Sequence, residues 1–191
     1  MKPQINLDEI KNSFFKSIAK IKRRVIICAG TGCVANGSLE IYSKFQEEIR
    51  NNNLDLVVSI ELEKEAEHGI LTSKSGCQGF CQMGPLVTIL PDEIMYVKVK
   101  LEDVKSIVEK TLGQSILIEK LLYKNPTTKE HNKGINEIDF YKKQNRYVLK
   151  ECGRINPSDI NEYISKDGYK AVQKAILNMS SEDICREITL S

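Results

Sequence analysis

The sequence predicts a small α/β domain that follows an N-terminal helix and precedes a mostly helical extension. Short apolar or alternating segments typical of strands occur at residues 24–28, 54–62, 86–90 and 94–99. Segments with apolar residues three or four positions apart, typical of helices, occur at residues 7–21, 39–49 and 101–112. Beyond residue 140 the pattern is helical. A sheet whose faces are covered by helices is the architecture that this order favours.

Length and composition narrow the class of protein. A chain of 191 residues is long enough for one domain with an appendage. Its 41% hydrophobic residues and net charge of +2 give no reason to expect binding to nucleic acid or to a membrane surface. No apolar run approaches the roughly 20 residues of a membrane span, and the N-terminus lacks a signal-peptide pattern. We therefore expect a cytoplasmic protein, in which six cysteines favour metal or redox chemistry over disulfides.

The first two elements lead directly to a cysteine. The helix at residues 7–21 is amphipathic, and Asn6 followed by Glu9 resembles a capping box at its start. With the residues before it, this helix forms a predicted N-terminal unit, residues 1–22. The buried strand at residues 24–28 then ends on Cys28.

The remaining elements complete a domain predicted at residues 23–123. Ser38 is suited to cap the helix at residues 39–49. Strict alternation predicts a half-buried strand at residues 54–62, and the turn "PDE" joins the last two strands into a hairpin. Gly113 ends the helix at residues 101–112, and residues 114–123 are expected to form one more helix.

The C-terminal third differs in composition. Residues 124–139 contain Pro, Gly, Asn and alternating charges, which indicates a linker. Residues 140–191 recover a helical pattern: Pro157 suits a first helical turn, and Ser180 with Asp183 can cap a last helix. A segment of this length with so few apolar side chains would barely fold alone. We therefore expect residues 140–191 to be the incomplete start of a further domain.

Four cysteines form two closely spaced pairs. Cys28 and Cys33 are spaced C-x4-C, Cys77 and Cys81 are spaced C-x3-C, and both loops are rich in glycine. Glycine lets backbone N–H groups turn toward a thiolate sulfur, and a [2Fe–2S] cluster needs four thiolates. A structural zinc site, a redox-active dithiol and four unrelated small residues are the alternatives, although neither spacing is the C-x2-C typical of the first two.

The motif "CAGTGC…SGCQGFCQMGP" resembles the thioredoxin-like [2Fe–2S] ferredoxin domain over roughly residues 20–113. That domain occurs in the 24 kDa subunit of NADH dehydrogenase and at the N-terminus of the NADH-binding subunit of iron-only hydrogenases. The resemblance implies a thioredoxin-like fold and a [2Fe–2S] cluster held by Cys28, Cys33, Cys77 and Cys81.

The stretch "FYKKQNRYVLKECGRINPSDINEYISKDGYKAVQKAI" is similar to the segment before the flavin domain in that hydrogenase subunit and in the 51 kDa NADH dehydrogenase subunit. It implies an NAD(P)H-linked multisubunit oxidoreductase, with FMN, NAD(P)H and [4Fe–4S] sites only in a missing downstream part. We therefore expect a fragment or a truncated product, whose partners are the other subunits. The "GTG" at residues 30–32 lacks the third glycine of a nucleotide loop, so one-electron transfer without catalytic residues is expected of this chain.

The other candidate residues favour structural roles. Cys152 and Cys185 have no partner at ligand spacing and are expected to be small buried residues. His68 and His131 are expected in solvated loops, and Lys98, Lys100 and Lys105 on a solvated face rather than a docking face. Phe80 is equally consistent with a lid over the cluster and with a core position. A zinc-binding interaction module without redox activity is the alternative function.

Overall fold

The computed structural model describes residues 5–60 and 69–191. In these residues no helix is both long and apolar enough to cross a membrane.

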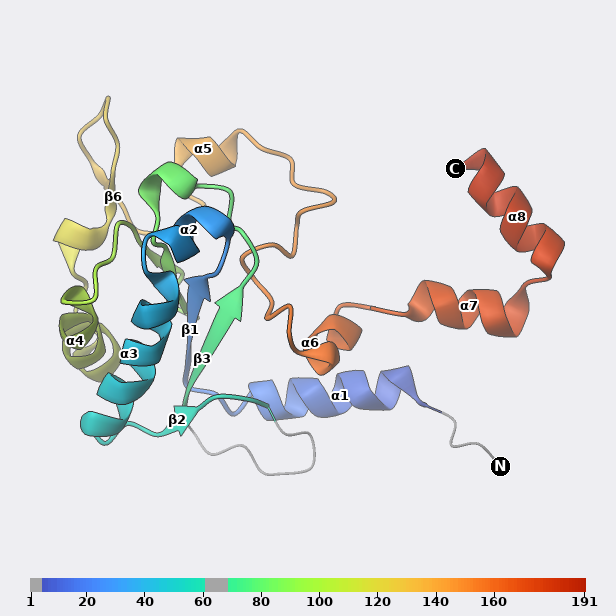
Figure 1. Cartoon of the computed structure of the whole chain (residues 1–191), viewed down its shortest axis with the longest axis horizontal. Coiled ribbons are helices and arrows are strands. Elements are labelled where there is room, and N and C mark those ends of the chain that lie inside the picture. Colours follow the sequence, from blue (N-terminus) through green and yellow to red (C-terminus); the bar gives the residue numbers. More distant parts are fainter. Residues whose placement is uncertain (1–4, 61–68) are drawn as a thin grey trace.

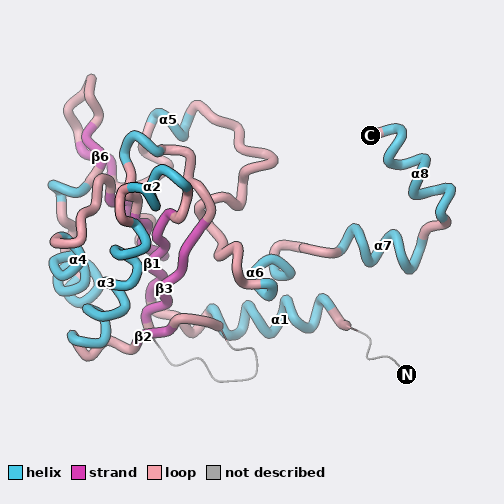
Figure 2. The backbone as a smooth tube through the Cα atoms, viewed as in Figure 1, coloured by secondary structure: helices cyan, strands magenta, loops and turns pink. Residues whose placement is uncertain are grey.

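A five-stranded sheet organises the protein, in the order β2-β3-β1-β4-β5 (Figures 1 and 2). The strands are β1 (Arg23–Cys28), β2 (Leu56–Val57), β3 (Ile70–Ser75), β4 (Val87–Leu90) and β5 (Ile94–Tyr96). Strands β2, β3 and β1 run parallel, whereas β4 is antiparallel to β1 and pairs with β5 as the predicted hairpin. Strand β1 therefore lies at the centre of the sheet, where its continuous apolar run is buried on both faces.

Strand β3 was not predicted. Its last four residues are polar, yet Thr72, Ser73 and Ser75 are buried beside β1. The backbone pairing of a central parallel strand, rather than apolar side chains, holds this segment in place. The predicted strand at residues 54–62 is wrong in extent, because only Leu56–Val57 form β2 and residues 61–62 lie outside the described residues.

One face of the sheet is covered by the helices predicted from apolar spacing. They are α3 (Ser38–Asn51), α4 (Asp103–Ser106) and its continuation η2 (Ile107–Gly113). Side chains such as Val25, Ile27 and Phe45 are completely buried between these helices and the sheet. Helix α3 begins after Gly37, which has φ +84°, so the prediction that Ser38 caps this helix is wrong.

The opposite face is covered by α1 (Leu7–Ile18) and α6 (Ile160–Ser165), which pack on each other (Figure 1). Asn6 caps α1 as predicted. Arg24 projects from β1 into this layer and donates to both carboxylate oxygens of Glu162. Both side chains are about nine-tenths buried, and this ion pair joins residues 138 positions apart in the sequence on one face of the sheet.

Residues 114–142 also pack on the sheet domain. The predicted helix at residues 114–123 is wrong: only the turn η3 (Glu119–Leu121) forms, because Leu121 and Leu122 are buried against the domain and Leu122 pairs with Tyr96. Within the predicted linker, β6 (Tyr123–Lys124) and β7 (His131–Asn132) form a small hairpin. Ile138, which precedes α5 (Asp139–Lys142), has no exposed surface.

The last two helices lie apart from the sheet (Figure 1). They are α7 (Lys170–Asn178) and α8 (Ser181–Leu190), and neither buries a residue. The predicted capping box of Ser180 and Asp183 is confirmed at the start of α8. The prediction that Pro157 lies in a first helical turn is wrong, because Pro157 lies in the turn before α6, whose N-cap is Asp159.

Candidate metal centre

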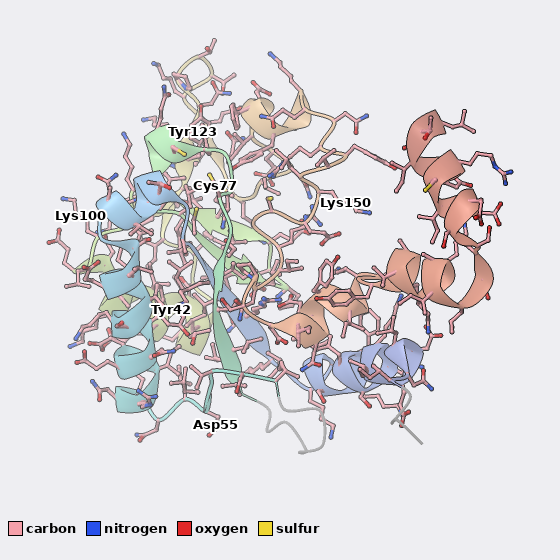
Figure 3. All side chains as sticks on the ribbon, turned by 45° about the vertical axis from the view of Figure 1, so that its right-hand side comes forward. Tyr42, Asp55, Cys77, Lys100, Tyr123 and Lys150 are labelled. Atoms are coloured by element: carbon pink, nitrogen blue, oxygen red, sulfur yellow. The ribbon has the colours of Figure 1, made fainter. Side chains whose placement is uncertain are left out.

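The four paired cysteines meet at one end of the sheet. Cys28 is the last residue of β1 and Cys33 lies in the short helix α2 (Thr31–Ala35). Cys77 follows β3, and Cys81 begins the 3-10 turn η1 (Cys81–Met83). Because β1 and β3 are adjacent and parallel, the loops after them emerge side by side. Figure 3 shows Cys77 at the end of the domain opposite Asp55.

The two pairs differ in exposure. Cys28 and Cys33 are 1% exposed and hydrogen-bonded to each other. Cys77 and Cys81 are exposed, and their sulfurs lie 3.8 Å apart. Two thiolates bound to one tetrahedral metal at about 2.3 Å would also be about 3.8 Å apart. The outer pair therefore has the spacing of two ligands of one metal atom.

Glycines let the two loops approach each other. A Cβ atom on Gly30 would lie 2.8 Å from the Cβ and 3.0 Å from the sulfur of Cys77. A Cβ atom on Gly84 would lie 2.6 Å from the sulfur of Cys33. Any larger residue at either position would fill the space between the loops, so both glycines help to form a cradle around the sulfurs.

Backbone N–H groups point at these sulfurs, as the glycine-rich loops predict. The N–H groups of Gln78 and Gly30 face Cys28, and that of Leu86 faces Cys33. The N–H of Gly79 donates to Cys77 Sγ over 3.3 Å. Such donors stabilise negative charge on sulfur, which a thiolate-bound iron–sulfur cluster requires.

The proximity of the thiols perturbs their acidity. The hydrogen bond from Cys33 lowers the pKa of Cys28 to about 6, aided by backbone N–H groups and opposed by burial. The same hydrogen bond, followed by burial, raises the pKa of Cys33. The Cys77 side chain raises the pKa of Cys81 through a hydrogen bond and its charge. The buried pair thus holds one thiolate and one thiol readily, and a second thiolate needs a nearby positive charge such as a metal.

The donor set suits a cluster with two metals. In the described part of the chain, no three His, Cys, Asp or Glu side chains converge closely enough to hold a single ion. A [2Fe–2S] cluster divides its four thiolates between two irons and does not need three at one ion. The four sulfurs, the glycine cradle and the N–H donors therefore fit this group.

An aromatic group covers the ligand loop. Phe80, between the two outer cysteines, stacks on Phe140 with ring centroids 4.8 Å apart, and it also contacts Tyr123 and Tyr141. Tyr141 donates a buried hydrogen bond to the carbonyl of Gln78, and burial raises the pKa of its hydroxyl. The sequence did not indicate this role for Phe140 and Tyr141, because they follow a polar segment that was predicted to be a linker.

The remaining candidates lie elsewhere. Cys152 is partly exposed and Cys185 is exposed, so the expectation that they are buried is wrong, most clearly for Cys185. Cys152 lines a cavity of about 260 Å³ between α1, the sheet and α6. His131 is exposed as expected, and His68 lies outside the described residues. Lys98, Lys100 and Lys105 are exposed, as expected of a solvated face.

The fold and the site together define a small α/β protein with a cysteine-thiolate centre at one end of its sheet. Its family follows from comparison with known sequences. The family model described as thioredoxin-like [2Fe–2S] ferredoxin matches residues 12–112, more than half of the chain, and the protein belongs to this family.

Individual proteins and one solved structure are similar to parts of the chain. A 2Fe-2S ferredoxin of Aquifex aeolicus (strain VF5) is 32% identical over 90 residues, which are 47% of this chain and 71% of that protein. A 2Fe-2S ferredoxin of Clostridium pasteurianum is 29% identical over 102 residues, 52% of this chain and 94% of that protein. The solved structure of a thioredoxin-like [2Fe–2S] ferredoxin from Aquifex aeolicus aligns with 53% of this chain and 89% of its own, at 29% identity and a TM-score of 0.42.

The predicted thioredoxin-like fold is therefore confirmed, with helices at both ends of the chain. The protein is a ferredoxin that carries a [2Fe–2S] cluster and transfers electrons.

Proposed function

We propose that Cys28, Cys33, Cys77 and Cys81 hold the [2Fe–2S] cluster. The observation that carries this assignment is the meeting of all four sulfurs in one glycine-walled cradle, with N–H donors directed at them. When bound, the cluster supplies one-electron chemistry. The protein positions the cluster, provides hydrogen bonds to the sulfurs and excludes water from the inner pair.

The two sides of the site have different tasks. Cys28 and Cys33 anchor the cluster in the core beside Leu86 and Ile138, all of which have 1% exposure or less. Cys77 and Cys81 are exposed, so they lie on the side at which a redox partner can approach closely. Electrons enter and leave through this outer side.

The physiological context is a multisubunit NAD(P)H-linked oxidoreductase of the hydrogenase or NADH dehydrogenase type, in the cytoplasm. There the cluster relays single electrons between a flavin and other iron–sulfur centres. Two observations support this context: residues 140–176 resemble the segment before a flavin domain, and Val172, Ile176 and Ile188 on the last helices are exposed. Apolar side chains in such number on an unpacked helix pair are typical of a surface that another part of a complex covers.

The domain division follows from this context. Residues 1–22 are the N-terminal unit that contains α1, and residues 23–123 are the ferredoxin domain. Residues 124–139 are a linker that packs on this domain, and residues 140–191 are the start of a flavin- and NADH-binding domain. FMN, NAD(P)H and a [4Fe–4S] cluster belong to the part of that domain outside this sequence, and the other subunits of the complex are the partners.

Matched thiol substitutions test the ligand assignment. Cys77→Ser replaces a thiolate with a poor iron ligand, so we expect loss of most of the iron and acid-labile sulfide after anaerobic purification. Cys152→Ser removes a thiol outside the cradle and should leave both unchanged. Equal losses in the two variants would overturn the assignment.

Purification of the complex from native cells tests the context. A complex that contains FMN and oxidises NADH or NADPH is expected. A ferredoxin that elutes alone, without a flavoprotein partner under mild conditions, would contradict the proposed context but not the cluster.

A further inference from the structure

Tyr141 contacts the cluster loop from outside the part of the chain that matches the family. The match ends at residue 112, whereas Tyr141 lies in α5. Its side chain is 7% exposed and packs with Cys28, Cys33 and Ile138 in one apolar cluster. Its ring also makes edge contacts with Phe80 and Phe140 at centroid distances of 5.6 and 5.1 Å. This packing fixes the hydroxyl in one place.

Two hydrogen bonds meet at a single peptide unit of the loop. Tyr141 Oη donates to the carbonyl oxygen of Gln78 over 3.1 Å. The N–H of the same peptide unit belongs to Gly79, and it donates to Cys77 Sγ over 3.3 Å. The bonds form a continuous series from the tyrosine hydroxyl, through one peptide, to a cysteine sulfur.

The peptide can transmit polarisation because its two ends are coupled. A hydrogen bond to a carbonyl oxygen draws electron density from the amide nitrogen, which makes the N–H a stronger donor. The orientation of this peptide also depends on its sequence, because Gly79 has φ +87°, a conformation that favours glycine. The backbone of Gly153 packs closely against the side chain of Gln78. A Cβ atom added to Gly153 would lie only 2.7 Å from Gln78 Cγ.

We infer that Tyr141 is a positioning residue for the cluster loop, which orients and polarises the Gln78–Gly79 peptide toward Cys77 and thereby raises the reduction potential of the cluster. The inference rests on the proposed role of Cys77 as a ligand. Reduction adds one negative charge to the cluster, so a stronger N–H donor at a ligand sulfur favours the reduced form. The potential thus depends on a segment that follows the ferredoxin domain, and displacement of α5 would make it more negative.

Tyr141→Phe tests the inference, because it keeps the ring and removes only the hydroxyl. Tyr123→Phe is the matched control: its ring also contacts Phe80, 5.3 Å away, but across the described residues its hydroxyl makes no hydrogen bond with the loop. A hydrogen bond that a charged sulfur accepts is strengthened by roughly 10–30% when it is coupled to a second one. The ratio of reduced to oxidised protein then changes by up to about fivefold. At 59 mV per tenfold, this is up to roughly 40 mV.

The measurement is an anaerobic redox titration of the cluster-loaded full chain, followed by visible absorption and EPR. Tyr141→Phe should shift the midpoint to a more negative potential, while Tyr123→Phe should match the wild type. Pulsed EPR of the reduced protein after exchange into D2O supplies a second readout, in which the exchangeable proton nearest the sulfur should couple more weakly in Tyr141→Phe.

The outcomes separate the two proposals. A wild-type chain without a [2Fe–2S] cluster, or with a cluster that survives Cys77→Ser, would overturn the ligand assignment. A cluster-loaded Tyr141→Phe with the potential and proton coupling of Tyr123→Phe would overturn the role of Tyr141 and leave the ligand assignment intact.

Discussion

Gly30→Ala tests whether the close approach of the two cysteine loops holds the cluster. The added Cβ atom would lie 2.8 Å from Cys77 Cβ and 3.0 Å from Cys77 Cα, so the backbone of the second loop must move. Overpacking of this kind costs about 1–3 kcal/mol, or roughly a 5- to 150-fold change in an equilibrium constant. For a chain of this length, each kcal/mol lowers the melting temperature by about 2–4 °C.

Gly76→Ala is the control for Gly30→Ala, since no atom lies within 4 Å of its added Cβ. The rate of iron loss to a chelator and thermal unfolding by circular dichroism are the two assays, both on cluster-loaded protein. We expect faster iron loss and a lower melting temperature for Gly30→Ala, with Gly76→Ala close to the wild type. If both variants retain iron equally, the cradle does not require a glycine at position 30.

Two further predictions concern the layer formed by α1 and α6. Arg24→Met leaves the buried Glu162 carboxylate without its charged partner, so we expect the free energy of unfolding, measured with denaturant, to fall by about 3–5 kcal/mol. The double variant Arg24→Met with Glu162→Leu removes the unpaired charge and should recover most of this loss. An equally unstable double variant would show that packing, not the unpaired charge, causes the loss. A hydrogen bond from Lys11, and a smaller effect from Lys170, lower the pKa of Asp167. The ionised Asp167 therefore stabilises the fold above pH 3.8, the ordinary pKa, and this stabilisation is lost as the pH falls through the lower pKa of the folded protein. NMR titration should place this pKa below 3.8, and Lys11→Met should raise it; an unchanged value in Lys11→Met would refute the contact.

The elements predicted correctly are those whose own residues determine them. Helices α1 and α3, the central strand β1 and the hairpin of β4 and β5 have regular apolar periodicity, and the structure contains all of them. Strand β3 was missed because its polar side chains are buried by contacts with distant residues. Thr72 accepts a hydrogen bond from Gln46 of α3, and Ser73 accepts one from Arg24, and the sequence of the strand does not encode these contacts. The helix expected at residues 114–123 was wrong for the same reason, since contacts with Tyr96 override the local helical pattern.

The site was predictable in its residue types but not in its surroundings. The spacing of the cysteines and the glycines beside them indicated a four-thiol centre before any contact was known. The convergence of the thiols depends on the parallel neighbours β1 and β3, and one of these strands was not foreseen. Tyr141 was missed because its contact with Gln78 spans 63 positions, and no local pattern reports a contact of that separation.

The metal content and EPR spectrum of the chain after anaerobic purification test the [2Fe–2S] assignment most directly. We expect a brown protein with two irons and two acid-labile sulfides per chain, EPR-silent when oxidised and with a signal on one-electron reduction. A colourless protein with one zinc ion per chain and no signal on reduction would contradict it.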